Sequence, residues 1–231
     1  MCGRYTLTVT LDELMAHYWI NGNNVPFHQP KYNIAPGQLI PAIIHDGTTR
    51  RLGELKWGLV PPWADDPKTG FMMINARAET AAAKPAFAGP LQRKRCLIPA
   101  DGFYEWKITA SGKQPMRIVM RNRTLFSMAG LYESWIAPDG SKVSTCTIVT
   151  TQPNELKASI HNRMPVILPP EAEQIWLDRS ITSTAELQKL LQPYPPEEME
   201  AYAVSAAVGS VRNDSPELIL PIPQADQLEL F

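Results

Sequence analysis

The order of strand-like and helix-like segments along the chain is the feature that most limits its fold. Runs rich in β-branched and aromatic residues favour strands, and they cover residues 39–45, 54–60, 95–100, 103–108, 116–121, 125–135 and 144–151, with a late strand at 201–209. Helical patterns are found at 10–19 and later at 153–160, 169–178 and 183–192. Because strands and helices are segregated rather than alternating, we expect an α+β fold. The expected architecture is a single domain with a curled, mainly antiparallel, barrel-like β-sheet flanked by helices.

Short-range signals mark the ends of these segments. Thr10 with Glu13, and Ser183 with Glu186, form the pattern of a helix capping box. The 22 prolines are spread along the chain and predict rigid loops at 23–37, 58–70 and 193–198.

Composition excludes several classes of protein. A net charge of −1 means that an anionic partner would need a local basic patch. No apolar run approaches the roughly 18 residues of a membrane span, and no signal peptide is visible, so we expect a cytoplasmic protein without membrane contact. Cys2, Cys96 and Cys146 are too widely spaced for a zinc site. The last two lie in apolar runs and are expected in the core, and no metal or cofactor is predicted.

The segment from 74 to 79 alternates polar and apolar residues. On an extended backbone, Asn75, Arg77 and Glu79 would share one face. An ordinary amphipathic edge strand would show the same pattern, but asparagine is uncommon in strands. Asn75 and Arg77 are therefore candidate site residues.

The segment that follows the expected turn at 101–102 places a carboxylate between two aromatic residues. Glu105 would face one side of a strand with Lys107, while Tyr104 and Trp106 face the other. Partial desolvation raises the pKa of a carboxylate and suits it to proton transfer near neutral pH. A solvent-facing Glu105 paired with Lys107 is the equally weighted alternative.

Two loops carry further candidates. His161 follows a helix and shares a loop with Arg163; it could move protons or stabilise an oxyanion, or it could simply interact with the helix dipole. Trp63, held by the prolines at 61–62, could stack on bases of a single strand. Trp57 lies in a strand and is expected in the core.

Cys2 is an unusual residue to find directly after the initiator methionine. Aminopeptidases remove Met1 when residue 2 is small, and the exposed Cys2 would then carry an amine and a thiol on adjacent carbons. An accidental cysteine in a frayed terminus is the alternative, and the first five residues alone favour it.

Six motifs in this order, however, resemble the SRAP family (SOS response-associated peptidase), the abasic-site-processing proteins. They are "MCGRY", "YNIAPG", "WGLVPPW", "NARAET", "ADGFYEWK" and "HNRMPV". The resemblance covers roughly residues 2–221, which we expect to form one such domain.

The resemblance implies a function and its residues. Cys2 would crosslink to abasic sites in single-stranded DNA through a thiazolidine, with Asn75, Glu105 and His161 around it. Arg4 and Arg77 would contact phosphates, and Trp63, Trp106 and Arg163 are added as DNA-binding candidates. The family name implies an autopeptidase that removes Met1, and the imine chemistry implies a weak lyase activity.

Two other functions are compatible with the residues. An N-terminal-nucleophile amidohydrolase would use the thiol of Cys2 as nucleophile, its own amine as base, and Asn75 as an oxyanion donor. A non-catalytic single-strand binder would use the tryptophans and arginines and would not need Cys2.

The C-terminal segment 222–231 is expected to leave the domain as a tail. Its final residues Gln227, Leu228, Leu230 and Phe231 resemble the QLxLF peptide that binds the bacterial DNA polymerase sliding clamp. An edge strand folded back on the sheet is equally compatible with this alternation. We expect a monomer.

Overall fold

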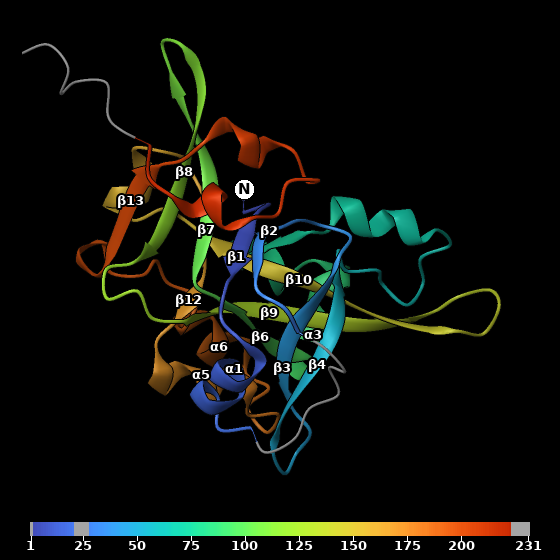
Figure 1. Cartoon of the computed structure of the whole chain (residues 1–231). Helices are drawn as coiled ribbons and strands as arrows, with labels where there is room; N and C mark the ends of the chain where they lie inside the picture. The colour runs from blue at the N-terminus through green and yellow to red at the C-terminus, as the bar shows by residue number, and fades with distance from the viewer. Residues whose placement is uncertain (1, 21–27, 223–231) are drawn as a thin grey trace, which may run out of the picture.

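A closed ring of five strands forms the centre of the molecule in the computed structural model, which describes residues 2–20 and 28–222 (Figure 1). Four neighbouring pairs, β3–β4, β3–β6, β6–β9 and β9–β10, are antiparallel. The parallel pair β10–β4 closes the ring. The strands are β3 (Leu39–His45), β4 (Arg50–Trp57), β6 (Arg95–Ala100), β9 (Phe126–Ile136) and β10 (Lys142–Thr151).

A second sheet of five antiparallel strands lies beside this barrel, in the order β13-β8-β7-β1-β2. Its strands are β1 (Tyr5–Leu7), β2 (Lys31–Ile34), β7 (Gly102–Thr109), β8 (Gly112–Met120) and β13 (Met199–Ala203). The N-terminal strand β1 is an inner strand of this sheet, with β7 on one side and β2 on the other. The start of the chain is therefore held by backbone pairing on both sides.

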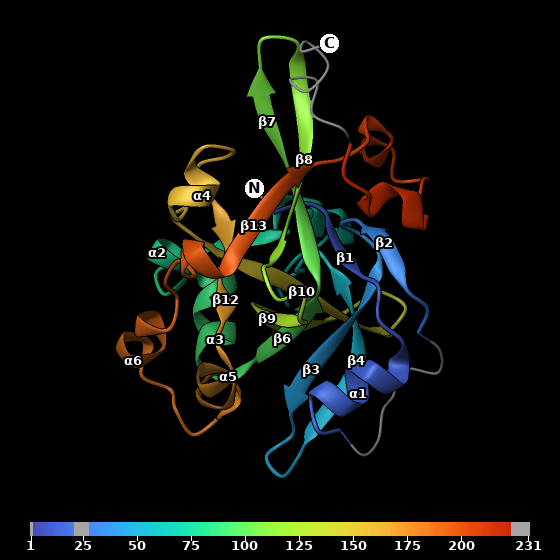
Figure 2. The same ribbon diagram turned by 60° about the vertical axis from the view of Figure 1, so that its left-hand side comes forward.

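Short helices and strands surround the two sheets. The α-helices are α1 (Leu11–His17), α2 (Ala78–Ala81), α3 (Pro85–Arg93), α4 (Glu155–Ala158), α5 (Pro170–Leu177) and α6 (Thr184–Lys189). The 3₁₀ helices are η1 (Pro67–Met72), η2 (Pro196–Glu198), η3 (Ala206–Gly209) and η4 (Pro216–Ile219). The remaining strands are β5 (Asn75–Arg77), β11 (Met164–Pro165) and β12 (Ile167–Leu168). Of these, β5 pairs in parallel with β10. The α4 helix lies against β13, near the start of the chain (Figure 2).

Close backbone contact fixes the loop that leads into β5. A Cβ atom on Gly58 would lie 2.8 Å from the carbonyl oxygen of Gly70, and Gly58 has a φ of +129°, so both sterics and conformation demand glycine there. The buried Trp57 indole donates to the Ile74 carbonyl at 2.9 Å. Trp57 is thus a core residue, as predicted, and it anchors the residue before Asn75.

The predicted α+β class and the barrel-like sheet are confirmed, and the expected helices are present with the Thr10–Glu13 capping box formed. Two local predictions were wrong, and one helix was missed. The loop expected at 23–37 contains β2, the strand expected at 201–209 ends at Ala203 and continues as η3, and no helix was predicted where α3 lies. Pro90 occupies the interior of α3, and proline usually ends a helix.

Two further predictions concern the ends of the chain and membranes. Within residues 2–20 and 28–222, no helix has the length and apolar character required to cross a membrane. The C-terminal peptide from Gln227 to Phe231 lies outside the described residues.

Candidate functional site

The residues at the start of β1 run alongside β7, which brings Cys2 to Glu105. Tyr5 pairs with Phe103, and the Tyr104 amide donates to the Arg4 carbonyl at 2.9 Å. Cys2 is fully buried, and Glu105 is 3% exposed. The sequence alternative of a solvent-facing Glu105 is therefore excluded.

Asn75 contacts Cys2 from the barrel side. Its Nδ2 donates to the Cys2 carbonyl oxygen at 3.0 Å and to the Ile74 carbonyl at 2.7 Å. The parallel pairing of Asn75 with Ile148 of β10 fixes the backbone. Asn75 therefore holds the backbone of residue 2 rather than its thiol.

A buried lysine completes the cluster. Lys157 is fully buried, and its Nζ lies 3.5 Å from Glu105 Oε1. The Asn154 side chain caps α4 and accepts from the Lys157 amide at 2.9 Å, which fixes the position of this residue. The sequence analysis missed Lys157. Its place in the last turn of the helix expected at 153–160, four residues before His161, was the available signal.

His161 lies one turn after Lys157. Its amide donates to the Lys157 carbonyl at 2.8 Å, and its Nδ1 accepts from the Arg163 amide at 3.1 Å. Burial lowers the pKa of His161 from its ordinary value, so the ring is neutral at pH 7. Because Nδ1 is an acceptor, the neutral ring carries its proton on Nε2 and can donate there.

The thiol of Cys2 is a weak acid in this environment. Burial, followed by the negative charge of Glu105, raises its pKa to about 12. The positive charge of Lys157 acts in the opposite direction. The thiol is therefore protonated at neutral pH.

Arg4 and Trp106, both DNA-binding candidates, contact one another. The Arg4 guanidinium lies 5.9 Å from the Trp106 ring centroid and donates to the Asn33 side chain and to the carbonyls of Val208 and Gly209. Arg4 thus connects the sheet to η3.

The prediction that Asn75, Arg77 and Glu79 share a strand face was wrong beyond Arg77. The strand ends at Arg77, and Glu79 belongs to α2. The Glu79 carboxylate accepts hydrogen bonds from Nη1 and Nη2 of Arg163, at 2.7 and 3.0 Å. Arg77 is exposed, and Trp63 is 61% exposed on the loop between β4 and η1.

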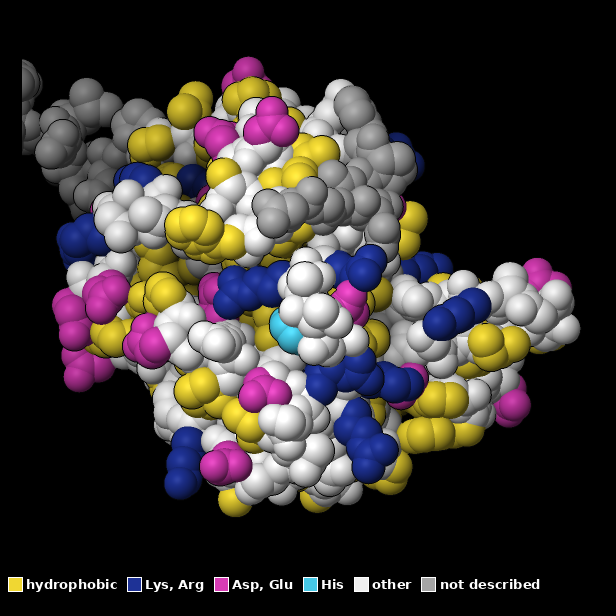
Figure 3. All heavy atoms as spheres, turned by 90° about the horizontal axis from the view of Figure 1, so that it is seen from below, with side chains coloured by type: hydrophobic (Ala, Val, Ile, Leu, Met, Phe, Trp, Pro, Cys, Tyr) yellow, Lys and Arg dark blue, Asp and Glu magenta, His cyan; other side chains and the backbone are white. Residues whose placement is uncertain are grey.

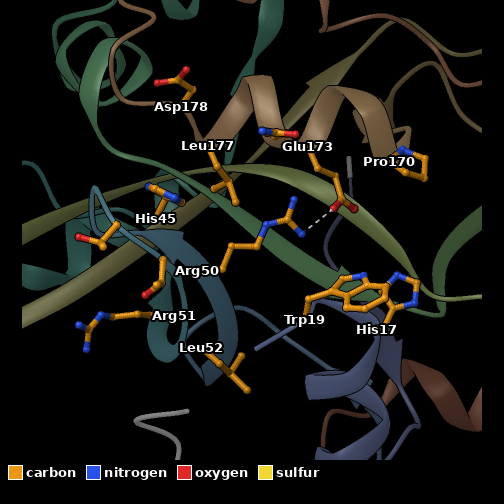
Figure 4. A pocket seen from close by; sticks show the side chains of 13 residues that line it. His17, Trp19, His45, Arg50, Arg51, Leu52, Pro170, Glu173, Leu177 and Asp178 are labelled. Carbon is orange, nitrogen blue, oxygen red and sulfur yellow. Dashed lines mark hydrogen bonds and ion pairs between the residues drawn. The ribbon is translucent and has the colours of Figure 1, made fainter. Parts of the chain in front are cut away.

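A wide cleft lies elsewhere, between α1, α5 and the β3–β4 hairpin. It measures about 1120 Å³ and contains none of the predicted site residues. Its walls carry the ion pair of Arg50 with Glu173, 3.4 Å apart, and the 87% exposed Trp19 (Figure 4). On this end of the molecule, Lys and Arg side chains are interspersed with Asp and Glu, so no single sign of charge dominates (Figure 3).

Comparisons with known proteins point to one family. The family model for SOS response associated peptidase (SRAP) matches residues 1–211. The chain is 53% identical over 222 residues to the abasic site processing protein YoqW of Bacillus subtilis, covering 95% of this chain and 99% of that one. It is 37% identical over 227 residues to the abasic site processing protein HMCES of Gallus gallus, and the match covers 84% of this chain and 67% of that one. A crystal structure of a protein from Bacteroides thetaiotaomicron matches with a TM-score of 0.86 and 28% identity, and the match covers 96% of this chain and 100% of that one. The chain belongs to the SRAP family.

Proposed function

We propose that this protein processes abasic sites in single-stranded DNA by forming a covalent thiazolidine with Cys2 after Met1 has been removed. The abasic-site-processing names of the relatives support the substrate class. The observation that carries the proposal is the buried cluster in which Asn75 holds the backbone of Cys2 and Glu105 lies beside it.

The reaction requires only the groups of the first residue and an aldehyde. The Cys2 amine adds to C1′ of the ring-opened sugar, and loss of one water gives an imine. The thiol then adds to the imine carbon, and its proton passes to the nitrogen, which closes a five-membered ring. Because amine and thiol belong to one residue, the second step is intramolecular and strongly favoured.

The protonation states favour the amine as the first nucleophile. An α-amine has an ordinary pKa of about 7.7–8.0, so part of it is neutral near pH 7.5. The thiol, with its pKa raised to about 12 by burial, offers almost no thiolate. An amidohydrolase whose thiol attacks first would therefore depend on the Cys2 amine to remove the thiol proton.

The surrounding residues take distinct roles. Glu105 transfers protons during ring opening and loss of water, since it is buried and acts on the Cys2 group electrostatically. His161 donates through Nε2 to the sugar oxygen released on ring opening. Asn75 orients residue 2 through its carbonyl.

DNA contacts would come chiefly from exposed groups. Arg77 and Trp63 are exposed and suit phosphate contact and base stacking. Arg4 and Arg163 already bond within the protein, so their main contribution would be to shape the surface.

The test uses a uracil-containing single strand treated with uracil-DNA glycosylase. The protein should give a heat-stable gel shift, and mass spectrometry should place the DNA remnant on a peptide that begins at Cys2. Cys2→Ser keeps the amine without the thiol and should give an adduct that survives heat only after borohydride reduction.

An intact heat-stable crosslink in Cys2→Ala would refute the thiazolidine mechanism. Turnover of a small amide without a DNA adduct would instead support the amidohydrolase. Strand cleavage in the same gel would measure the proposed weak lyase activity, and recombinant protein from cells lacking methionine aminopeptidase would test autocatalytic loss of Met1.

A further inference from the structure

Lys157 is a fully buried lysine whose charge has one close partner. Its Nζ faces Glu105 Oε1 at 3.5 Å, the upper limit of hydrogen bonding, and makes no shorter hydrogen bond within the described part of the chain. A lysine has three N–H donors and strongly prefers water. In this position, the Nζ of Lys157 therefore makes fewer hydrogen bonds than its three N–H donors allow.

Stability alone does not explain this arrangement. Replacing a buried ion pair by apolar residues of similar volume is often neutral or stabilising. By this rule, apolar residues at both 105 and 157 could replace the pair without loss of stability, whereas removing Lys157 alone removes a charge partner of the buried Glu105. The charge at this position is better explained by its action on neighbouring groups.

Three titratable groups from separate segments interact electrostatically with Lys157, and Glu105 is the one in direct contact. Glu105 comes from β7, Cys2 from the start of the chain, and His161 from the residues after α4. The positive charge of Lys157 lowers the pKa of both the Cys2 thiol and the His161 ring. Burial in turn lowers the pKa of Lys157 itself.

We propose that Lys157 is a positioning residue for the crosslinking reaction, holding the Glu105 carboxylate in place and disfavouring a second positive charge on the Cys2 amine. This inference rests on the proposed function. A nearby cation makes the protonated amine less favourable, so a larger fraction of the amine is neutral and able to attack at a given pH. Lys157 thereby extends crosslinking to lower pH.

The test is the pH dependence of the crosslinking rate, measured with protein in excess over an abasic single strand. Lys157→Met and Lys157→Gln both remove the charge, the first with an apolar chain of similar length and the second with retained donors. Lys189→Met is the matched control, because it removes an exposed helical lysine on α6. Circular dichroism and binding to an unmodified strand verify that each variant is folded.

We expect the rate to rise with pH to a plateau, with the midpoint in the charge-removal variants higher by on the order of one pH unit, as for a nearby like charge. Below both midpoints this makes them about tenfold slower, and the difference narrows at high pH. Lys189→Met should retain the wild-type midpoint. Lys157→Arg keeps the positive charge and should also retain the wild-type pH midpoint.

Two results would overturn the inference. One is an unchanged midpoint in both charge-removal variants, with or without a lower plateau. The other is a borohydride-trapped adduct on Lys157 itself, which would make it a nucleophile. Cys2→Ala in the same assay separates the two proposals. A heat-stable crosslink in Cys2→Ala would refute the proposed function. Loss of the crosslink in Cys2→Ala, together with an unchanged pH midpoint in the Lys157 variants, would refute only the role of Lys157.

Discussion

Asp101→Asn should strongly destabilise the protein, because this carboxylate connects β1 and the residues after it to Arg117 of β8 within the second sheet. Its Oδ2 accepts from the Thr8 amide at 2.6 Å and from the Thr8 hydroxyl, and its Oδ1 accepts from Thr6 Oγ1 and from Arg117 at 3.3 Å. The side chains of Asp101 and Arg117 are 9% and 7% exposed. Asparagine removes the charge and turns one acceptor into a donor that faces other donors.

The magnitude follows from the distance. At 3.3 Å and an effective dielectric constant of about 20, the attraction is about 5 kcal/mol. Removing one partner of a buried pair costs about 3–5 kcal/mol in measured cases. We therefore expect a loss of about 4 kcal/mol in the free energy of unfolding, which is a large part of the roughly 5–15 kcal/mol of a typical domain.

Urea denaturation measures this loss. With an m-value of about 3 kcal/mol/M, the midpoint should fall by about 1.3 M while m stays constant. Asp46→Asn is the matched control, since Asp46 also accepts backbone amides and pairs with an arginine, Arg51, but in an exposed loop. A midpoint shift for Asp101→Asn no larger than that for Asp46→Asn would refute the reasoning.

Three further predictions concern other parts of the chain. Burial raises the pKa of Glu173, so the folded state binds this proton more tightly than the unfolded state does. The free energy of unfolding should therefore fall as pH rises from the ordinary glutamate pKa through the raised one, and Glu173→Gln should reduce this fall. Equal slopes of the free energy of unfolding against pH for the two proteins, from pH 4 to 7, would contradict the prediction. His161→Ala should lengthen the lifetime of the adduct in a competitor-trap assay if His161 assists reversal, and an unchanged lifetime would count against that role. A labelled "QADQLELF" peptide should bind a bacterial sliding clamp with micromolar affinity in fluorescence anisotropy; no saturable binding, or binding that persists when Leu230 and Phe231 are alanine, would favour the fold-back alternative.

Local sequence patterns were sufficient for the elements whose stability is local. The capping box at Thr10 and Glu13 predicted α1, and its reciprocal bonds are formed. The alternation at 103–108 predicted the strand β7, and Tyr104 and Trp106 pack together in one cluster, apart from Phe103 in the main core, as that alternation requires. Each of these signals depends on residues within a few positions of one another.

Elements that depend on distant partners were not predictable in the same way. β2 is a strand because it pairs with β1, although prolines on both sides suggested a loop. The residues 101–102 were expected as a turn, and nothing local indicated that Asp101 would bind Thr6, Thr8 and Arg117. Lys157 was overlooked for the same reason, because its partner Glu105 lies 52 positions earlier in the chain.

The contacts around Cys2 show how this fold holds the start of its chain in place. A free terminus normally frays, since few contacts offset its conformational entropy. Here β1 pairs on both edges, Asp101 binds the residues after it, and Asn75 binds the carbonyl of Cys2. Arg4, which the resemblance assigned to phosphate, contributes to the same restraint through η3 and Trp106. In the proposed reaction, this restraint would let the amine and the thiol meet an aldehyde in one orientation, which is the condition for a fast ring closure.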